Sequence, residues 1–295
     1  MLPLTRIDHI RLRVSDPERA ERFYSNILGL DILGRTPDGG AWLGGRDGRF
    51  ALALSPEDGD GNASRAEFGY EVDPAADLED LARKLRDGGV VITKAPRDGP
   101  RPGANGFSVS DPAGNTVWII SSANGNGRPN PLPGGAEDRP ISPRKLGHVV
   151  IKVADRNASE VFYREKFGLQ VTEYNQMGLV FLRCGPDHHD LGLLPLPGGR
   201  PLGLHHYAFD IGNTSEVARA EQFLKERSVK IEKGPGFWNQ GHHIEIYFLD
   251  PDSHAIEIYC NIDQYAETAP PETTASFYTP VHFGESEVPR GFQKF

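Results

Sequence analysis

Apolar and polar residues along the chain form short alternating runs, separated by a few stretches with helical spacing. Residues 7–14 alternate between the two classes, as a half-buried β-strand does. Residues 16–30 carry apolar side chains at helical spacing and reach Gly29, a residue type that often ends helices. The same spacing predicts helices over residues 76–85, 156–167 and 215–227. The pattern therefore predicts a mixed α+β protein in which single helices follow leading strands.

This pattern repeats along the chain with a constant offset of 139 residues. The matched pairs are His9 and His148, Phe23-Tyr24 and Phe162-Tyr163, and Asp111-Pro112 and Asp250-Pro251. Self-similarity of this kind indicates two homologous halves in one register.

A shorter offset of 58 residues relates two segments within the second half. His148 and His206 each belong to a strand-like run, and Asp155 and Asn213 follow those runs at the same offset. Asp and Asn are favoured helix N-caps, so each is expected to start a helix. We interpret the chain as four copies of one unit, which consists of a strand, a helix and further strands.

Length and composition narrow the class of protein. The 295 residues are enough for two domains, and 34 glycines with 24 prolines are typical of a turn-rich β protein. A net charge of −9 argues against a nucleic-acid partner. Only Cys184 and Cys260 are present, which argues against a disulfide framework. With no apolar leader and no long apolar run, we expect a cytoplasmic protein without a membrane partner.

Two histidines and one glutamate occupy similar places in three apolar runs of the second half: His148, His206 and Glu257. Two imidazoles and a carboxylate are the donor set of a facial triad, which suits non-haem Fe(II) and leaves coordination positions open. A lone strand histidine is more often structural, but three ligand-type residues at related positions favour a metal site.

One segment, residues 234–259 (GPGFWNQGHHIEIYFLDPDSHAIEIY), completes the pattern. With it, the chain resembles the vicinal oxygen chelate superfamily, and within it the two-domain extradiol ring-cleaving dioxygenases related to catechol 2,3-dioxygenase, over roughly residues 5–265. The resemblance implies four βαβββ modules paired into two half-open barrels. It also implies that only the second barrel binds iron, through His148, His206 and Glu257.

The 139-residue offset agrees that only the second half is a metal site. It places His9, Glu67 and Trp118 where the ligands stand, and an indole is no ligand for iron. We therefore expect a metal-free first domain over residues 1–122, a linker over 123–143, a catalytic domain over 144–265 and a tail over 266–295 that wraps over the second domain. His9 is then interpreted as a structural strand histidine.

The resemblance suggests further catalytic residues. In the family a histidine upstream of the second ligand lines the oxygen side, and His189 matches that place better than His188. Family enzymes also carry a tyrosine ten residues before the glutamate ligand, and Tyr247 stands there. The simpler alternatives are a loop histidine in a polar turn and a tyrosine packed in a strand. His205 is expected to point outward or to lie behind the ligands, since strand neighbours face opposite sides.

One position departs from the family pattern. Family enzymes commonly have a histidine nine residues before that tyrosine, and here the residue is Trp238, which cannot shuttle a proton. Either His242 or His243 supplies the missing group, or the site performs different chemistry. Trp238 alternatively forms an aromatic wall for a planar substrate. Ser253 replaces the glycine usual in this turn, which we interpret as a local change.

The sequence therefore predicts an Fe(II)-dependent extradiol dioxygenase, with Mn(II) as the alternative metal, that acts with O2 on a small catechol-type ring. A different metalloenzyme on this scaffold, such as a hydroquinone-cleaving enzyme, an isomerase or a lyase, is a second hypothesis. A non-enzymatic protein that binds an aromatic ligand is a third. Arg183 and Arg200 are candidates to recognise a carboxylated ring, and the resemblance implies a homo-oligomer.

Overall fold

The structure is a computed structural model that describes residues 1–36, 38–45, 50–57, 65–94, 100, 104–121, 141–196, 202–265, 272–275 and 277–283. Its first half contains two βαβββ units. The first unit is β1 (Leu4–Val14), α1 (Pro17–Asn26), β2 (Asp31–Arg35), β3 (Ala41–Gly44) and β4 (Phe50–Pro56). The second is β5 (Glu67–Val72), α2 (Leu78–Asp87), β6 (Ile92–Lys94), β7 (Asn105–Ser110) and β8 (Thr116–Ser121).

The second half repeats this order. Its first unit is β9 (Lys145–Val153), α3 (Arg156–Phe162), the π-helix η1 (Tyr163–Phe167), β10 (Gln170–Asn175), β11 (Val180–Arg183) and β12 (Leu191–Pro195). Its second is β13 (Gly203–Gly212), α4 (Thr214–Glu226), β14 (Ile231–Trp238), β15 (His243–Leu249) and β16 (Ala255–Cys260). β17 (Glu272–Thr274) and β18 (Tyr278–Pro280) follow.

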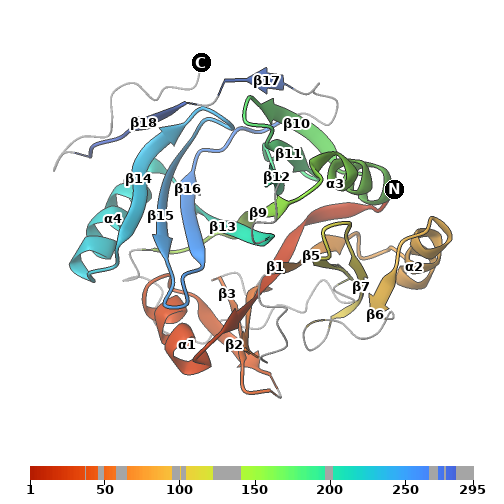
Figure 1. Ribbon diagram of the computed structural model, residues 1–295. Coiled ribbons are helices and arrows are strands. Elements are labelled where there is room, and N and C mark those ends of the chain that lie inside the picture. The colour runs from red at the N-terminus through yellow and green to blue at the C-terminus, as the bar shows by residue number, and fades with distance from the viewer. Residues whose placement is uncertain are drawn as a thin grey trace.

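Each half forms one sheet with the same strand order. The first sheet runs β2-β3-β4-β1-β5-β8-β7-β6, and the second runs β10-β11-β12-β9-β13-β16-β15-β14 between two added edge strands. In both halves the leading strands of the two units pair antiparallel at the centre. The second sheet curves so that β14–β16 lie on one side and β10–β12 on the other (Figure 1). The predicted α+β fold with paired βαβββ units is confirmed.

The two helices of the second half begin within one residue of where the sequence predicts. The Asp155 carboxylate accepts a hydrogen bond from the backbone of Ala158, and Asn213 forms a capping box with Glu216 at the start of α4. Two predicted helices differ from the structure: the stretch over 16–30, where α1 ends at Asn26, and the stretch over 156–167. Residues 156–167 form α3 and then a single π-helical turn, which ends at Gly168 in the left-handed conformation (φ 83°). Helical spacing alone does not distinguish a π-turn from an α-turn.

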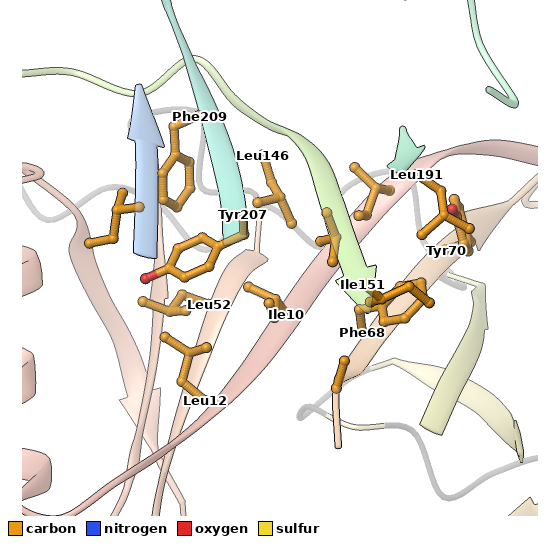
Figure 2. Close-up of a cluster of buried hydrophobic side chains, with 14 of the residues drawn as sticks. Ile10, Leu12, Leu52, Phe68, Tyr70, Leu146, Ile151, Leu191, Tyr207 and Phe209 are labelled. Atoms are coloured by element: carbon orange, nitrogen blue, oxygen red, sulfur yellow. The ribbon is translucent and has the colours of Figure 1, made fainter. Parts of the chain in front are cut away.

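The main hydrophobic core lies between the two halves. Side chains from both sheets meet there, and Figure 2 shows Ile10, Leu12, Leu52, Phe68 and Tyr70 of the first half beside Leu146, Ile151, Leu191, Tyr207 and Phe209 of the second. These side chains are almost fully buried. Burial of this shared apolar surface holds the two domains against each other.

Two buried hydrogen bonds cross between the halves at corresponding positions. The Tyr24 hydroxyl donates to Asp250 Oδ2 over 2.7 Å, and the Tyr163 hydroxyl donates to Asp111 Oδ2 over 2.8 Å. Tyr24 and Tyr163, like Asp111 and Asp250, are 139 residues apart. Each half thus supplies the tyrosine for the aspartate of the other, and the sequence repeat becomes an approximate twofold arrangement of the two domains.

The C-terminal segment adds strands at both edges of the second sheet. β17 pairs with β10 and β18 pairs with β14, so the segment lies over the second half of the molecule (Figure 1). Most of the predicted linker over 123–143 and most of the tail lie outside the described residues. Among the helices that the structure describes, none is both long and apolar enough to cross a membrane.

Candidate active site

The predicted ligands meet on three neighbouring strands of the second sheet. His148 lies on β9, His206 on β13 and Glu257 on β16, and these strands are adjacent in the order β9-β13-β16. The Nε2 atoms of His148 and His206 each lie 3.2 Å from Glu257 Oε2. All three side chains are buried. The structure therefore brings together the two imidazoles and the carboxylate that the sequence predicts.

The chemical state of these side chains fits a divalent metal. Burial lowers the pKa of His148, which favours the neutral imidazole that metals bind. Burial alone would raise the pKa of Glu257, but attraction to His148 and hydrogen bonds from the three surrounding histidines hold it well below its usual value. The Glu257 carboxylate is buried and lies within 3.3 Å of the Nε2 atoms of His148, His206 and His243. A buried carboxylate beside imidazole nitrogens suits a bound cation.

A cavity of about 380 Å³ opens onto the three residues. One wall is apolar and consists of Val150, Met177, Leu179, Phe181 and Leu194, from β9 to β12 and the turn after β10. The opposite wall is polar and aromatic, from β13 to β16. An apolar pocket with a few converging polar groups is the usual form of a small-molecule site.

His189 lies in the loop between β11 and β12 and faces this cavity. Its ring centroid is 4.1 Å from that of His148, and its side chain is buried. Burial and the neighbouring His148 and His188 hold the pKa of His189 well below its usual value. His188 is buried as well, but it turns away to contact Glu173. The geometry thus brings His189 next to the ligands, as the resemblance implied.

Tyr247 lies beside the ligands on the other wall. Its hydroxyl donates to Glu257 Oε2 over 2.5 Å, and its ring is 5.2 Å from that of His206. Burial and the nearby Glu245 and Glu257 raise its pKa well above 10, so the phenol stays protonated. Its one hydroxyl hydrogen is directed at the Glu257 carboxylate inside the cavity.

Of the two adjacent histidines that the sequence left open, only one reaches the cavity. His243 is buried, with Nε2 3.2 Å from Glu245 Oε2 and 3.3 Å from Glu257 Oε1. Burial lowers its pKa, but these two carboxylates raise it to about 9. His242 has a positive φ of 44°, its side chain is 59% exposed, and its imidazole contacts Asp263. The catalytic role predicted for His242 finds no support in this geometry.

Trp238 lines the cavity at the end of β14, opposite His243 in the β14–β15 pairing. The Lys233 ammonium lies 4.2 Å from the Trp238 ring centroid and 2.5 Å from Glu245 Oε1. Lys233 and Glu245 were not among the candidates identified from the sequence. The alternation of side chains along a strand could have identified Glu245, because positions 243, 245 and 247 lie on the same face of β15.

The other candidates have different positions. His205 is exposed and lies at the cavity rim, with its Nδ1 2.6 Å from Nδ1 of His206. Arg183 is buried outside the cavity lining and donates to Gln170 and the Gly185 carbonyl. Arg200 lies outside the described residues. Among the described residues, Lys233 rather than Arg183 lines this cavity.

The corresponding place in the first half is filled by side chains. Arg11 Nε donates to Glu67 Oε1 over 2.8 Å, and Trp118 Nε1 donates to the same oxygen over 2.9 Å. His9 is buried and contacts Asp8. This half therefore holds an ion pair and an indole where the second half has its candidate ligands.

The sequence model of the Glyoxalase/Bleomycin resistance protein/Dioxygenase superfamily matches residues 6–119 and 145–258, one match in each half. The chain is 24% identical over 273 residues to the manganese-dependent 2,3-dihydroxybiphenyl 1,2-dioxygenase of Geobacillus genomosp. 3, covering 87% of this chain and 85% of that one. It is 27% identical over 263 residues to the biphenyl-2,3-diol 1,2-dioxygenase of Paraburkholderia xenovorans, covering 85% and 86%.

A solved structure has the same fold. The 2,3-dioxygenase LapB from Pseudomonas sp. KL28 superposes with a TM-score of 0.79 at 23% identity, covering 93% of this chain and 98% of the other. Both the two-domain arrangement and the strand order thus belong to a known architecture.

Proposed function

Because the chain belongs to the Glyoxalase/Bleomycin resistance protein/Dioxygenase superfamily, we propose that it is a metal-dependent extradiol dioxygenase of a catechol-type substrate. The observation that carries the proposal is the buried His148–His206–Glu257 cluster at the floor of a small, largely apolar cavity. Named relatives are extradiol dioxygenases, which supports ring-cleaving dioxygenase activity. In the net reaction one O2 is consumed, both oxygen atoms enter the product, and one ring C–C bond breaks.

His148, His206 and Glu257 would hold the metal. When bound, a divalent metal supplies Lewis acidity that favours ionisation of the adjacent hydroxyls of a catechol and brings the ring together with O2. We expect Fe(II), with Mn(II) as the alternative, since this donor set accepts both.

The remaining residues orient the ring and handle protons. With substrate bound, the Tyr247 hydroxyl would turn its hydrogen from Glu257 to a ring oxygen, and its high pKa keeps it protonated. His189 accepts or returns a proton at the opposite side of the cavity. His243, rather than His242, takes the place of the histidine replaced by Trp238, and Trp238 forms an aromatic wall. The apolar wall around Leu179 and Phe181 faces the rest of the ring.

Reconstitution tests the proposal directly. Metal-free protein is loaded anaerobically with Fe(II) or Mn(II) and mixed with a panel of catechols and hydroquinones. An O2 electrode and an absorbance scan then follow the reaction. We expect uptake of one O2 per ring cleaved and a yellow ring-opened product from at least one catechol. Gel filtration of the same protein tests the expected homo-oligomer.

Two features of the cavity favour a second candidate. Trp238 cannot replace a catalytic histidine, and Glu245 adds a buried carboxylate that could act as a base. An isomerase or lyase of the same superfamily would use such a base without O2. Stoichiometric metal binding with no O2 uptake on any catechol or hydroquinone would favour this candidate over the dioxygenase.

A further inference from the structure

A chain of buried hydrogen bonds runs behind His189, and every member has a defined direction. It begins at two backbone N–H groups, which are donors only. Met177 N and Leu179 N donate to Asn175 Oδ1 over 3.0 and 2.9 Å. The Asn175 oxygen is therefore fixed on this side, and its Nδ2 donates to Gln240 Oε1 over 3.2 Å.

The direction passes from Gln240 to Glu173. Because Gln240 Oε1 accepts from Asn175, Gln240 Nε2 is the end that donates to Glu173 Oε1, over 3.0 Å. The Thr274 hydroxyl of β17 donates to the same oxygen. Burial would raise the pKa of Glu173, but hydrogen bonds from His188, Thr274 and Gln240 hold it below its usual value. Glu173 is thus an ionised carboxylate, which only accepts hydrogen bonds.

When His188 is neutral, an ionised Glu173 determines the hydrogen positions of both histidines. His188 Nε2 lies 2.8 Å from Glu173 Oε2, so this nitrogen carries the hydrogen. In a neutral imidazole the other nitrogen is then an acceptor. His188 Nδ1 lies 2.9 Å from His189 Nδ1, so the hydrogen between them belongs to His189. The remaining nitrogen of His189, Nε2, carries the lone pair.

Packing keeps both rings in this arrangement. Phe181 contacts both imidazoles, with ring centroids 5.3 Å from His188 and 4.6 Å from His189. A Cβ at position 241 would lie 3.0 Å from His188 Cγ, and Gly241 has a φ of +74°, so this position requires glycine. The His188 backbone N–H is held by the Asp263 carbonyl over 2.8 Å.

We infer that Glu173 and His188 are positioning residues that hold His189 in the tautomer with its hydrogen on Nδ1, so that Nε2 serves the cavity as a proton acceptor. Thr274 makes the C-terminal strand β17 part of this device. The catalytic use of that nitrogen rests on the proposed function, whereas the tautomer itself does not.

The isosteric substitution Glu173→Gln should invert the chain. Oε1 of residue 173 receives two donors, so the amide oxygen of the glutamine stays there and its NH2 group faces His188. His188 Nε2 must then accept, its Nδ1 takes the hydrogen and donates to His189, and the hydrogen of His189 moves to Nε2. Glu160→Gln is the matched control, because Glu160 is also buried and paired but contacts Arg156, Arg164 and Tyr174.

The measurement is a long-range 1H–15N correlation spectrum of 15N-histidine-labelled, metal-free protein, with the His189 signals assigned by their loss in His189→Phe. We expect the Nδ1–H tautomer of His189 in the wild type and in Glu160→Gln, and the Nε2–H tautomer in Glu173→Gln. An Nε2–H tautomer in the wild type, or the same tautomer in wild type and Glu173→Gln, would overturn the inference. This readout is independent of O2 consumption, so it separates failure of the inferred hydrogen-bond chain from failure of the proposed function.

Kinetics add a second readout on the metal-loaded enzyme. Glu173→Gln should lower kcat by about 100-fold or more, with KM and metal content close to wild type, as expected for a misdirected proton acceptor. If Glu173→Gln does not fold, His188→Asn and His188→Leu replace it. Asn keeps an oxygen acceptor near the Nδ1 position, whereas Leu has none. We expect His189 to keep its Nδ1–H tautomer only in His188→Asn, and identical spectra would overturn the relay.

Discussion

The two halves of the chain share one strand order, but they use the centre of the sheet differently. In the second half His148, His206 and Glu257 face a cavity, and Val150 beside them is small and apolar. In the first half the position that corresponds to Val150 is Arg11, whose guanidinium pairs with Glu67 and lies over the Trp42 ring. The long Arg11 side chain thus fills the space in the first half that the short Val150 side chain leaves open as a cavity in the second.

The first half differs from the second by more than the identity of the proposed ligands. Glu67 and Trp118 stand where a histidine and a glutamate would be needed, and Arg11 occupies the space beside them. The retained features are those of packing: the shared core and the reciprocal Tyr–Asp bonds between halves. The first half therefore acts as the structural partner of the second.

The largest expected effect comes from removing one ligand. His206→Ala should abolish metal binding and activity, because the site loses one of its two imidazoles while the first domain keeps its fold. Glu67→Ala, at the corresponding position of the first half, is the control and should leave the metal in place. Metal analysis after reconstitution decides, and full metal occupancy in His206→Ala would refute the ligand assignment.

The reverse change should create a second site. Glu67→His and Trp118→Glu restore a His–His–Glu set with His9, and Arg11→Val clears the space beside it. We expect metal stoichiometry to rise from one to two per chain in the triple variant only. If the double variant that retains Arg11 binds the second metal equally well, Arg11 does not separate the two halves.

Tyr247 has no counterpart in the first half, where Ser108 corresponds to it. Tyr247→Phe should keep the metal and lower kcat by about 10- to 100-fold, because the hydrogen bond proposed between the Tyr247 hydroxyl and a ring oxygen is lost. Steady-state kinetics with the native substrate measure this change. Unchanged kinetics would reduce Tyr247 to a packing role.

The smallest effect concerns the two corresponding aspartates at the domain interface. Burial raises the pKa of Asp111, and its contribution to stability is lost as pH rises through its folded pKa. Burial acts on Asp250 as well, but hydrogen bonds and attraction from His254 and a bond from Tyr24 lower its pKa. Its contribution is therefore lost as pH falls through its folded pKa.

Asp250→Asn should therefore cost about 1–2 kcal/mol near neutral pH, with the cost decreasing towards about pH 3.5. Asp111→Asn should show the opposite trend, with its cost largest in acid. Urea unfolding over this pH range measures both free energies. His254 of the second half corresponds to Asn115 of the first. If both variants show the same pH trend, His254 does not cause the difference in pKa between Asp250 and Asp111.

The sequence alone determined the repeat, the unit of strand and helix, and the three residues proposed as ligands. These follow from local periodicity and from fixed offsets, which survive without any knowledge of packing. The resemblance favoured His189 over His188 for the place beside the ligands, but the contact of His188 with Glu173 was not predicted. Which neighbour faces the cavity depends on a loop whose geometry does not follow strand alternation.

Only the tertiary structure decided the rest. Strand pairing set Lys233 and Glu245 at the cavity and turned His242 to the surface. The chain from Asn175 through Gln240 to Glu173 joins residues 65 and 67 positions apart, and Thr274 reaches it from the C-terminal segment. Such contacts cannot be predicted from the spacing of residues along the chain, because they depend on where the edges of a curved sheet come together.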